Sequence, residues 1–417
     1  MQTLKIKDFS CIKSAQLQLT PLTLIIGPQA SGKSVISKLI YFCTSPIIDY
    51  DRLMIDEMYT IDQMKKSIAV QFCEWFPVSA WGDKRFVIDF TSGLFSLSIT
   101  RIGKSDRVKI TLDSEFSDFY TSNSQKYLGL IEKADAEVEF DVKWQFRNQS
   151  ENSLKKWLGA GKVDIQLFIP AGRSFFTSVG KALVAFEHSG ILDPITIEFG
   201  RRFASMRERQ IRRPPSQESS LAKALFTEIL GGQLRSEGGK EYLATSDGRL
   251  IPFSALSSGQ QELLPLAVLL RSVLPSLAKG VPSRVMNYRR NTFIEEPEAH
   301  LFPRAQNRLV EILASVVKKR NHNLILTTHS PYVLAKFNNL IKAGQLARKF
   351  RSDPRLNAIV QEESWIPPKS VSAFAIIDNR LHPIIDEFGM IAADYLDEVS
   401  GDISTEFSKL LELEYSK

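Results

Sequence analysis

Cysteine is scarce in this 417-residue sequence, which contains only Cys11, Cys43 and Cys73. Their spacing matches no metal-ligand pattern and does not indicate a disulfide framework, so a reducing cytoplasm is the simplest compartment. No apolar run approaches the roughly 20 residues of a membrane helix. The N-terminus, MQTLKIKDFS, also lacks an apolar signal core. We therefore expect a cytoplasmic protein without a membrane partner.

A strong excess of charge of one sign is also missing. The 53 Lys and Arg residues exceed the 47 Asp and Glu residues by 6, which permits a nucleic-acid or other acidic partner without requiring one. No long heptad segment is present, which argues against a coiled-coil arm. The hydrophobic content of 43% is that of a globular protein, and the length is enough for two or three lobes.

The apolar pattern predicts an α/β fold that begins with antiparallel strands. Alternating apolar residues over 4–19 predict a β-meander, and residues 22–26 form a short apolar run typical of a buried strand. A helix is expected over 35–42, with Ser45-Pro46 marking its end. Residues 51–80 should be helical. Further strands are expected at 85–90, 94–102, 107–112 and 164–169, whereas the pattern of 113–160 is too weak to place.

The second half returns to an α/β pattern after a helical stretch. Residues 174–250 are expected to be mainly helical. From 251 onward, apolar strands alternate with helices, and a C-terminal helix is expected from about Ile391. The expected strands lie at 292–296, 324–328 and 371–377. We therefore divide the chain into an N-terminal lobe, a helical insertion and a C-terminal lobe, at 1–173, 174–250 and 251–417.

A phosphate-binding loop is the most specific motif. Residues 27–34, GPQASGKS, match G-x-x-x-x-G-K-[ST] and lie between the expected strand and helix, the context that makes this motif credible. Its backbone amides and the helix N-terminus should face phosphate oxygens. Lys33 should reach the β- and γ-phosphates, and Ser34 should ligate Mg²⁺. The residues expected to bind the nucleotide are Gly27, Ala30, Ser31, Gly32, Lys33 and Ser34.

Two carboxylates end the apolar strand in Phe293-Ile294-Glu295-Glu296-Pro297. Placed beside the phosphate loop, Glu295 would lie near Mg²⁺ and Glu296 would activate the attacking water. Glu295 is one methylene longer than the aspartate usual at the metal side, so contact through a water molecule is an alternative to direct contact. The non-functional alternative for both is a solvated acidic turn.

Two further polar segments complete the set. Leu256-Ser257-Ser258-Gly259-Gln260-Gln261-Glu262 precedes an apolar helix and offers hydroxyls and amides to a γ-phosphate, although it is equally well explained as a helix N-terminus. The residues expected to bind nucleotide there are Ser257, Ser258, Gly259 and Gln260. His329, in Leu326-Thr327-Thr328-His329-Ser330-Pro331, would contact the γ-phosphate and the attacking water. The alternative is a structural histidine at a strand end.

In this order the four segments resemble the motif set of ABC ATPases. GPQASGKS resembles the Walker A motif, LSSGQQ the signature, FIEEPE the Walker B motif and TTHS the histidine switch. The opening residues resemble the head domain of SMC-like ATPases. LSSGQQE and EEPEAHLFP are most similar to OLD-type ATPases of bacterial anti-phage systems. The resemblance covers residues 1–45 and about 250–335.

The resemblance implies an ABC-type P-loop ATPase head, with an N-terminal β-meander, a mostly parallel RecA-like sheet flanked by helices, and a helical insertion. It implies slow ATP hydrolysis with Mg²⁺. It also implies a homodimer or larger homo-oligomer, in which one copy's signature completes the other copy's ATP site. Three features depart from the pattern. Ser258 stands where transporters usually carry glycine, Glu295 replaces aspartate, and the best Q-loop position, Ile169–Arg173, has no glutamine.

The resemblance also leads to a functional expectation. OLD nucleases carry a TOPRIM domain after the ATPase, but the residues after His329 show no glutamate-then-DxD pattern. We therefore expect an ATPase subunit of a defence system with a separate TOPRIM or HNH effector, as in PARIS or Septu, the PARIS type being favoured. The trigger would be a phage protein or DNA. A DNA-repair ATPase similar to SMC or RecF is the alternative, and a transporter ATPase is less favoured.

An arginine-dense stretch, Arg201–Arg213, stands apart from these motifs. Its simplest interpretation is a solvated helix face. The functional alternative is a docking surface for an acidic protein partner or a DNA-mimicking trigger.

Overall fold

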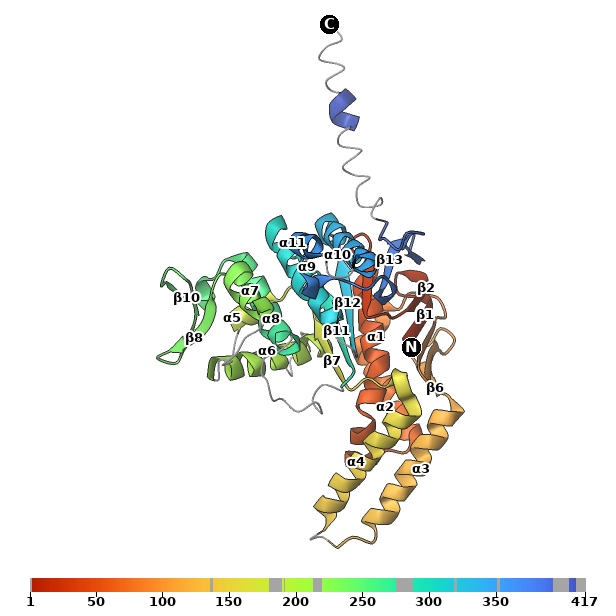
Figure 1. The fold of residues 1–417 in the computed structure, drawn as a ribbon. Coiled ribbons are helices and arrows are strands. Elements are labelled where there is room, and N and C mark those ends of the chain that lie inside the picture. Colours follow the sequence, from red (N-terminus) through yellow and green to blue (C-terminus); the bar gives the residue numbers. More distant parts are fainter. Residues whose placement is uncertain are drawn as a thin grey trace.

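A computed structural model describes residues 2–135, 138–179, 190, 192–212, 220–274, 288–318, 321–350, 353–392 and 405–409. Its centre is an 11-stranded sheet in the order β6-β5-β4-β1-β2-β14-β13-β3-β12-β11-β7 (Figure 1). The first six strands along the chain are β1 (Gln2–Phe9), β2 (Ile12–Gln18), β3 (Leu22–Ile26), β4 (Val87–Ser92), β5 (Phe95–Arg101) and β6 (Val108–Leu112). The others are β7 (Ile165–Ile169), β11 (Arg290–Glu295), β12 (His322–Thr328), β13 (Val371–Ile377) and β14 (Arg380–Pro383).

The sheet has a parallel half and an antiparallel half. Strands β7, β11, β12, β3 and β13 run parallel, each paired with its neighbour in the sheet. Strands β1, β2, β4, β5 and β6 form the expected antiparallel meander. Strand β14, which was not anticipated, joins the halves by pairing antiparallel to β13 and parallel to β2. The carboxyl ends of the parallel strands therefore meet at one edge of the sheet.

Two apolar cores cover the two faces of this sheet. One contains buried residues of helices α1 (Lys33–Ile48) and α2 (Ile61–Trp75), and the other those of α8 (Ser258–Val273), α9 (Pro303–Val317) and α10 (Pro331–Lys349). Successive strand residues point to opposite faces, so Leu24 belongs to the second core and Ile25 to the first. Strand β3 is buried along its whole length, as its five apolar or β-branched residues predict.

Helix α1 continues past Ser45-Pro46, so the expectation that it ends there is wrong. Pro46 removes a single N–H donor, and the bonds on either side persist: the Asp49 amide donates to the Ser45 carbonyl at 2.8 Å. The Ser45 hydroxyl donates to the Tyr41 carbonyl at 3.1 Å. Ile47 is fully buried, and this tertiary packing holds the last turn.

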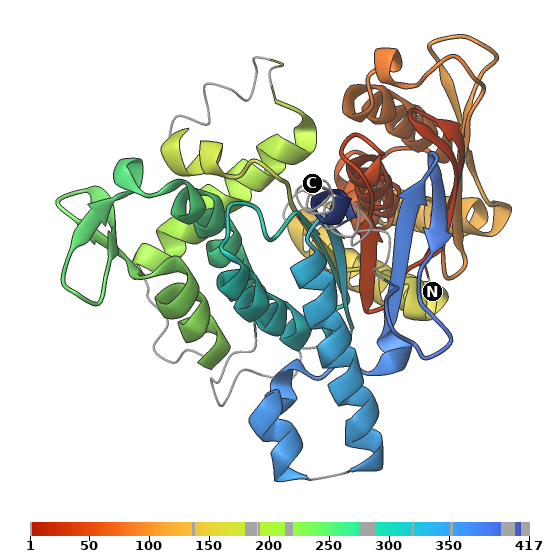
Figure 2. The same cartoon turned by 90° about the horizontal axis from the view of Figure 1, so that it is seen from above.

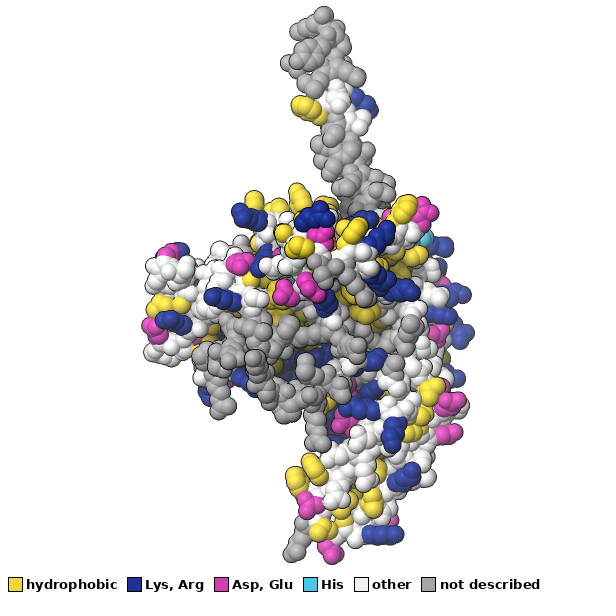
Figure 3. Space-filling view, in the orientation of Figure 1, with side chains coloured by type: hydrophobic (Ala, Val, Ile, Leu, Met, Phe, Trp, Pro, Cys, Tyr) yellow, Lys and Arg dark blue, Asp and Glu magenta, His cyan; other side chains and the backbone are white. Residues whose placement is uncertain are grey.

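Residues 113–160, which the pattern could not place, form helices α3 (Ser114–Ile131) and α4 (Glu139–Leu158). The two helices contact each other and project from the body as a hairpin (Figure 1). Asp113 begins α3, and its carboxylate accepts the Phe116 amide at 2.7 Å. Hydrophobic side chains remain visible along this hairpin, while basic side chains are spread over the same view of the molecule (Figure 3).

The stretch 174–250 is helical only in its first part. Helices α5 (Ser174–Val179), α6 (Pro194–Arg212) and α7 (Ser220–Ala224) are followed by the π-helical turn Leu225–Leu230. Strands β8 (Gln233–Glu237), β9 (Lys240–Ala244) and β10 (Leu250–Pro252) then form a second, antiparallel sheet, which corrects the helical expectation. Gly238 and Gly239, at φ 57° and 78°, supply the left-handed turn of its first hairpin. Figure 2 shows this sheet at the end of the molecule opposite the N-terminal meander.

The remaining elements follow the expected order. Strand β13 has the predicted bounds, and the short helix α11 (Pro354–Ile359) precedes it. Most of the expected C-terminal helix lies outside the described residues. Residues 405–409, which the structure does describe, are helical. Within the described ranges, none of the helices combines the length and apolar character that a membrane span needs. The three-part division of the chain stays a prediction.

Candidate functional site

Three of the four motifs meet at the carboxyl edge of the parallel strands. The phosphate loop follows β3, the paired carboxylates end β11, and His329 follows β12. Strand β12 lies between the other two in the sheet and pairs with both. Parallel pairing thus brings together the loop at residues 27–34, the carboxylates at 295 and 296, and His329, at the edge where α/β proteins bind ligands.

The phosphate loop has the backbone of an anion cradle. Ala30 and Gly32 adopt φ values of 59° and 105°, and the loop runs directly into α1. A Cβ at Gly32 would lie 2.9 Å from Cys11 Sγ and 2.9 Å from Ile12 Cγ1, so this position requires glycine for both its φ and its space. The loop is therefore fixed against the meander.

Lys33 lies buried within this loop. Its Nζ donates to the Gly27 carbonyl at 2.9 Å and to the Pro28 carbonyl at 2.7 Å. Burial lowers the pKa of Lys33, and the nearby Glu296 and Glu295 oppose that shift. The ammonium is consequently held over the loop with carboxylates close by.

Glu295 presents a buried carboxylate oxygen that accepts no hydrogen bond from the described residues. Its side chain is 5% exposed, and Oε2 accepts the Ala171 amide at 3.2 Å. Oε1 is buried and receives no hydrogen bond from any residue in the described ranges. Burial raises the pKa of Glu295, and the neighbouring Ser34 hydroxyl acts in the opposite direction. A buried carboxylate oxygen beside a hydroxyl is a donor set that suits Mg²⁺, which takes one or two protein oxygens together with substrate phosphates.

Glu296 and His329 are in direct contact. The distance from His329 Nε2 to Glu296 Oε1 is 3.0 Å, and both side chains are half-buried. Glu296 has a φ of 44°, a strained conformation for a residue with a side chain. Its amide donates to the Thr327 carbonyl at 2.9 Å, which ties the turn to β12. The carboxylate and the imidazole are therefore held as a pair.

Glu298 is a positioning residue that sequence reasoning missed. Its Oε1 accepts the Thr328 hydroxyl at 2.6 Å and the His329 amide at 2.9 Å. These bonds fix the backbone of the histidine loop from the Walker B side. The sequence does show Glu298 as a third acid in Glu295-Glu296-Pro297-Glu298. The direction in which its side chain points, however, depends on the turn after β11, which the sequence does not define.

Arg173 is a second missed residue. It lies in the turn proposed as the Q-loop, is fully buried, and donates to the carbonyls of Glu295 and Glu296 at 2.9 and 3.1 Å. Its Nε lies 3.1 Å from Glu262 Oε1, and the Glu262 carboxylate also accepts the amides of Arg173 and Ser174. Burial lowers the pKa of Arg173. The turn contacts the site through a guanidinium and the Ala171 amide.

The signature segment caps α8. The Ser257 hydroxyl accepts the Gln260 amide at 3.4 Å, and Gln260 Oε1 accepts the Ser257 amide at 3.2 Å, which is a capping box. A Cβ at Gly259 would lie 2.9 Å from the His300 carbonyl. Within one chain, the Gln260 amide group bonds the Leu230 carbonyl, not the phosphate loop. Nucleotide binding by Ser257, Ser258, Gly259 and Gln260 stays a prediction.

The arginine stretch is not uniformly solvated. Arg207 is 3% exposed, lies 3.3 Å from Glu241 and stacks over the Phe203 ring at 5.1 Å. The prediction of a solvated helix face is therefore wrong for Arg207, because this side chain is buried between α6 and the three-stranded sheet. Arg201 and Arg209 are exposed, and Arg213 lies outside the described residues.

Comparisons with known proteins identify the family of the chain. Residues 22–335 match a family described as "AAA domain, putative AbiEii toxin, Type IV TA system". The chain belongs to this family. A curated relative, the OLD nuclease of Thermus scotoductus, is 23% identical over 385 residues, which are 87% of this chain and 65% of the relative. The chain thus spans less than two thirds of that protein.

Three of the similar solved structures are SMC head domains. That of Thermotoga maritima has 12% identity and a TM-score of 0.37, covering 92% of this chain and 97% of that one. A head bound to the C-winged helix domain of ScpA has 13% identity and a TM-score of 0.41, covering 92% and 96%. That of Pyrococcus furiosus, bound to the C-terminal domain of ScpA, has 12% identity and a TM-score of 0.38, covering 97% and 100%. The family match confirms the expected P-loop ATPase family, and the 11-stranded mixed sheet flanked by helices confirms the expected α/β fold class.

Proposed function

We propose that this chain binds and hydrolyses ATP with Mg²⁺ at sites that are each completed by a second copy. The observation that carries the proposal is the 3.0 Å contact between Glu296 and His329, on the same sheet edge as the Lys33 loop and Glu295. Phosphoryl transfer to water needs a phosphate cradle, a metal ligand and a group that activates water. The edge offers one residue for each task.

The phosphate loop would bind the β- and γ-phosphates. Its backbone amides and the N-terminus of α1 face the anion, and Lys33 can exchange its two loop carbonyls for phosphate oxygens. Ser34 and Glu295 would hold Mg²⁺, which neutralises phosphate charge when bound. Among the described residues, no group of three or more His, Cys, Asp or Glu side chains is arranged to hold a metal ion. The ATP phosphates would therefore complete the coordination.

Glu296 would act as the general base. A carboxylate at the end of β11 can accept a proton from water as that water attacks the γ-phosphate. His329, in hydrogen-bonding contact with Glu296, would orient this carboxylate and the water. Glu298 and Arg173 are positioning residues, because they bond the backbone of the His329 loop and of the Glu295-Glu296 turn.

The signature would act in trans. The side chains of Ser257 and Ser258 are exposed at the start of α8, so a second copy can reach them. One chain has a single phosphate loop and a single signature, and two-fold symmetry would generate two equivalent composite sites.

The direct test of this function uses Glu296→Gln. Light scattering after gel filtration should show a monomer without nucleotide and a dimer with Mg²⁺ and ATP, because binding is retained and hydrolysis is blocked. Lys33→Ala should stay monomeric under both conditions. ATP-independent association of both variants would contradict a nucleotide-built dimer.

We further propose that the chain is the ATPase subunit of an anti-phage defence system and controls a separate nuclease of TOPRIM or HNH type. The support is the similarity to an OLD nuclease and the family description, which refers to a toxin system. A phage protein or DNA would be the trigger. Coexpression with a neighbouring nuclease gene should lower phage plaque counts, and Lys33→Ala should restore them. Unchanged plaque counts in both strains would contradict this role.

A DNA-repair ATPase is the second candidate, because the net charge is +6 and basic side chains are spread over the surface (Figure 3). DNA binding measured over a salt series would separate the two. A steep fall in affinity with salt indicates phosphate contacts. Absence of DNA binding at low salt would remove this candidate. A transporter subunit has less support.

A further inference from the structure

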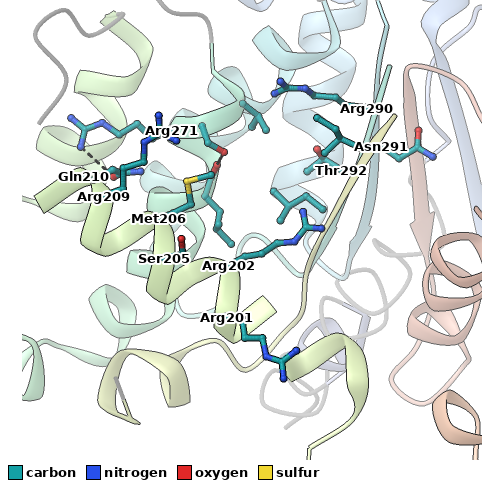
Figure 4. Close-up of a pocket in the computed structure, with 15 residues that line it drawn as sticks. Arg201, Arg202, Ser205, Met206, Arg209, Gln210, Arg271, Arg290, Asn291 and Thr292 are labelled. Atoms are coloured by element: carbon teal, nitrogen blue, oxygen red, sulfur yellow. Dashed lines mark hydrogen bonds between the residues drawn. The ribbon is translucent and has the colours of Figure 1, made fainter. Parts of the chain in front are cut away.

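A second site lies at the opposite edge of the parallel sheet. A cavity of about 730 Å³ opens between the amino ends of β7 and β11, helix α6 and the last turn of α8 (Figure 4). Small-molecule sites typically have volumes of roughly 300 to 1,000 Å³. The cavity shares no lining residue with the phosphate loop or with the Glu296 and His329 pair. It is therefore separate from the ATP site.

The lining of this cavity, which we call the arginine pocket, is strongly basic. Among the described residues that line it none is acidic, and its arginines are Arg201, Arg202, Arg209, Arg271 and Arg290. Arg202 forms an ion pair with Glu198, in which a guanidinium nitrogen lies 2.5 Å from Glu198 Oε1, and it donates to the Gln166 carbonyl at 2.7 Å. Within the described ranges, Arg209 and Arg290 form no ion pair with any carboxylate. These two guanidinium groups remain available to an anion.

The arginines around the hollow, including the two that form no ion pair among the described residues, Arg209 and Arg290, come from different sides of it. Figure 4 shows Arg209 and Arg271 on the side of α6 and α8, and Arg290 on the side of the sheet. Arg271 stacks over the Phe226 ring at 4.5 Å and donates to Gln210 at 3.4 Å. Burial lowers the pKa of Arg271 to about 10, so it is still charged at neutral pH. An anion in the middle would meet positive charge from two sides.

The floor of the arginine pocket is apolar. Leu167, Leu269 and Val273 are at least nine-tenths buried, and the partly buried Met206 adds a polarisable side chain. A ligand that matches both parts must combine an anionic group with an apolar body. An extended nucleic-acid strand matches less well, because the lining residues in the described ranges include no aromatic on which bases could stack.

We propose that the arginine pocket binds a phosphate-bearing small molecule of mononucleotide size, separately from the ATP site. Guanidinium groups pair with phosphate through two parallel hydrogen bonds, which favours phosphate for Arg209 and Arg290. The base or an equivalent apolar body would lie against Leu167, Met206 and Leu269. This assignment does not depend on the hydrolysis proposed above.

The position of the pocket gives its ligand a route to the ATP site. Arg290 begins β11 and Glu295 ends it, roughly 17 Å along the strand at a rise of about 3.4 Å per residue. Helix α8 likewise connects Ser257 at its start with Val273 in the pocket. A ligand that shifted either element would change ATP affinity, and by thermodynamic linkage ATP would change the ligand's affinity equally.

The experiment measures nucleotide binding in protein whose phosphate loop is disabled. Lys33→Ala protein is titrated by calorimetry with ATP, GTP, AMP, GMP and inorganic pyrophosphate. We expect at least one nucleotide to bind at one per chain. Adding Arg209→Gln and Arg290→Gln should weaken that binding by at least about tenfold, a loss of about 1.4 kcal/mol. Adding Arg235→Gln, an exposed arginine on β8, should leave it unchanged.

A second variant keeps the charges and removes the space. Ser205 is exposed and lines the cavity, so Ser205→Trp should block binding without disturbing the fold, which unfolding temperatures would verify. No nucleotide binding tighter than about 1 mM would overturn the proposal. The proposal would also be overturned if the pocket variants bound the nucleotide as tightly as the Lys33→Ala protein does, or if pyrophosphate bound as tightly as the nucleotide. Tighter arginine-dependent binding of a single strand of about 20 nucleotides would likewise overturn it.

Discussion

The two edges of the parallel sheet differ in charge and in chemistry. At the carboxyl edge, Glu295, Glu296 and Glu298 lie close to the cations Lys33 and Arg173. At the amino edge, the part of the chain that the structure describes contributes no acid to the lining of the arginine pocket. Between them, residues such as Phe293 and Ile294 are buried and apolar. The strands therefore hold the two charged regions apart. As proposed above, each edge would bind phosphate through different groups: a metal ion and loop amides at one edge, and guanidinium groups at the other.

The largest effect should come from the carboxyl edge. Lys33→Ala removes the ammonium that we propose binds the phosphates, and each lost charge-assisted bond is worth about 1.5 to 3 kcal/mol. We expect ATP affinity in calorimetry to fall at least about 100-fold for two such bonds. Lys66→Ala, on the outer side of α2, is the control and should bind normally. Unchanged affinity in Lys33→Ala would show that the loop is not the ATP site.

The next largest effect separates binding from chemistry at this edge. Glu296→Gln keeps the shape of the side chain and removes the base, so phosphate release should fall by about 10² to 10⁴. Filter binding should show retained ATP affinity. His329→Ala should lower kcat by less, because the imidazole orients a carboxylate that is still present. Normal turnover by Glu296→Gln would move the base to another residue.

Arg173→Met tests whether the buried ion pair of Arg173 and Glu262 stabilises the carboxyl edge. Removing one partner leaves Glu262 buried and uncompensated, which costs about 3 to 5 kcal/mol. Denaturant unfolding should show that loss. Arg173→Met with Glu262→Met should recover part of it, because no buried charge is left unpaired. A double variant less stable than the single one would mean that the pair does not act as a unit.

Glu295→Gln should give the smallest effect, and it should stabilise the fold, whereas Arg173→Met destabilises it. Its raised pKa means that it favours the fold when protonated, below its unfolded pKa, and that this contribution is lost as pH rises through the folded pKa. Glu295→Gln should therefore raise the unfolding temperature at neutral pH without Mg²⁺, and the gain should shrink at acidic pH. The exposed Glu237→Gln is the control. Lower stability of Glu295→Gln at neutral pH would contradict this electrostatic account.

Most residues of the carboxyl edge could be predicted from the sequence, because they lie in short contiguous motifs. A phosphate loop needs glycine at fixed positions between a strand and a helix, so Gly27–Ser34 could be located without a structure. Glu298 and Arg173 could not be assigned this way. Their partners, the His329 amide and the Glu295 and Glu296 carbonyls, are set by the turn after β11 and by packing.

The amino edge was not predictable, because its arginines come from α6, α8 and β11, which are far apart in sequence. The stretch around Arg207 was visible as a cluster, but helical geometry sends Arg207 inward to Glu241 and leaves Arg209 at the cavity. Local signals were also outweighed elsewhere. Pro46 did not end α1, whereas Gly238-Gly239 was a hairpin signal that the helical expectation overlooked.

The most direct test of the composite ATP site mixes two inactive variants. Ser257→Arg places a bulky cation on the signature, and Glu296→Gln removes the base. In a mixed dimer one site carries both changes, while the other pairs an intact Glu296 with an intact signature. Neither variant alone should hydrolyse ATP, and mixing should restore activity to at most half of the sites. Activity that is unchanged by mixing, or normal hydrolysis by Ser257→Arg alone, would contradict a site shared between two chains.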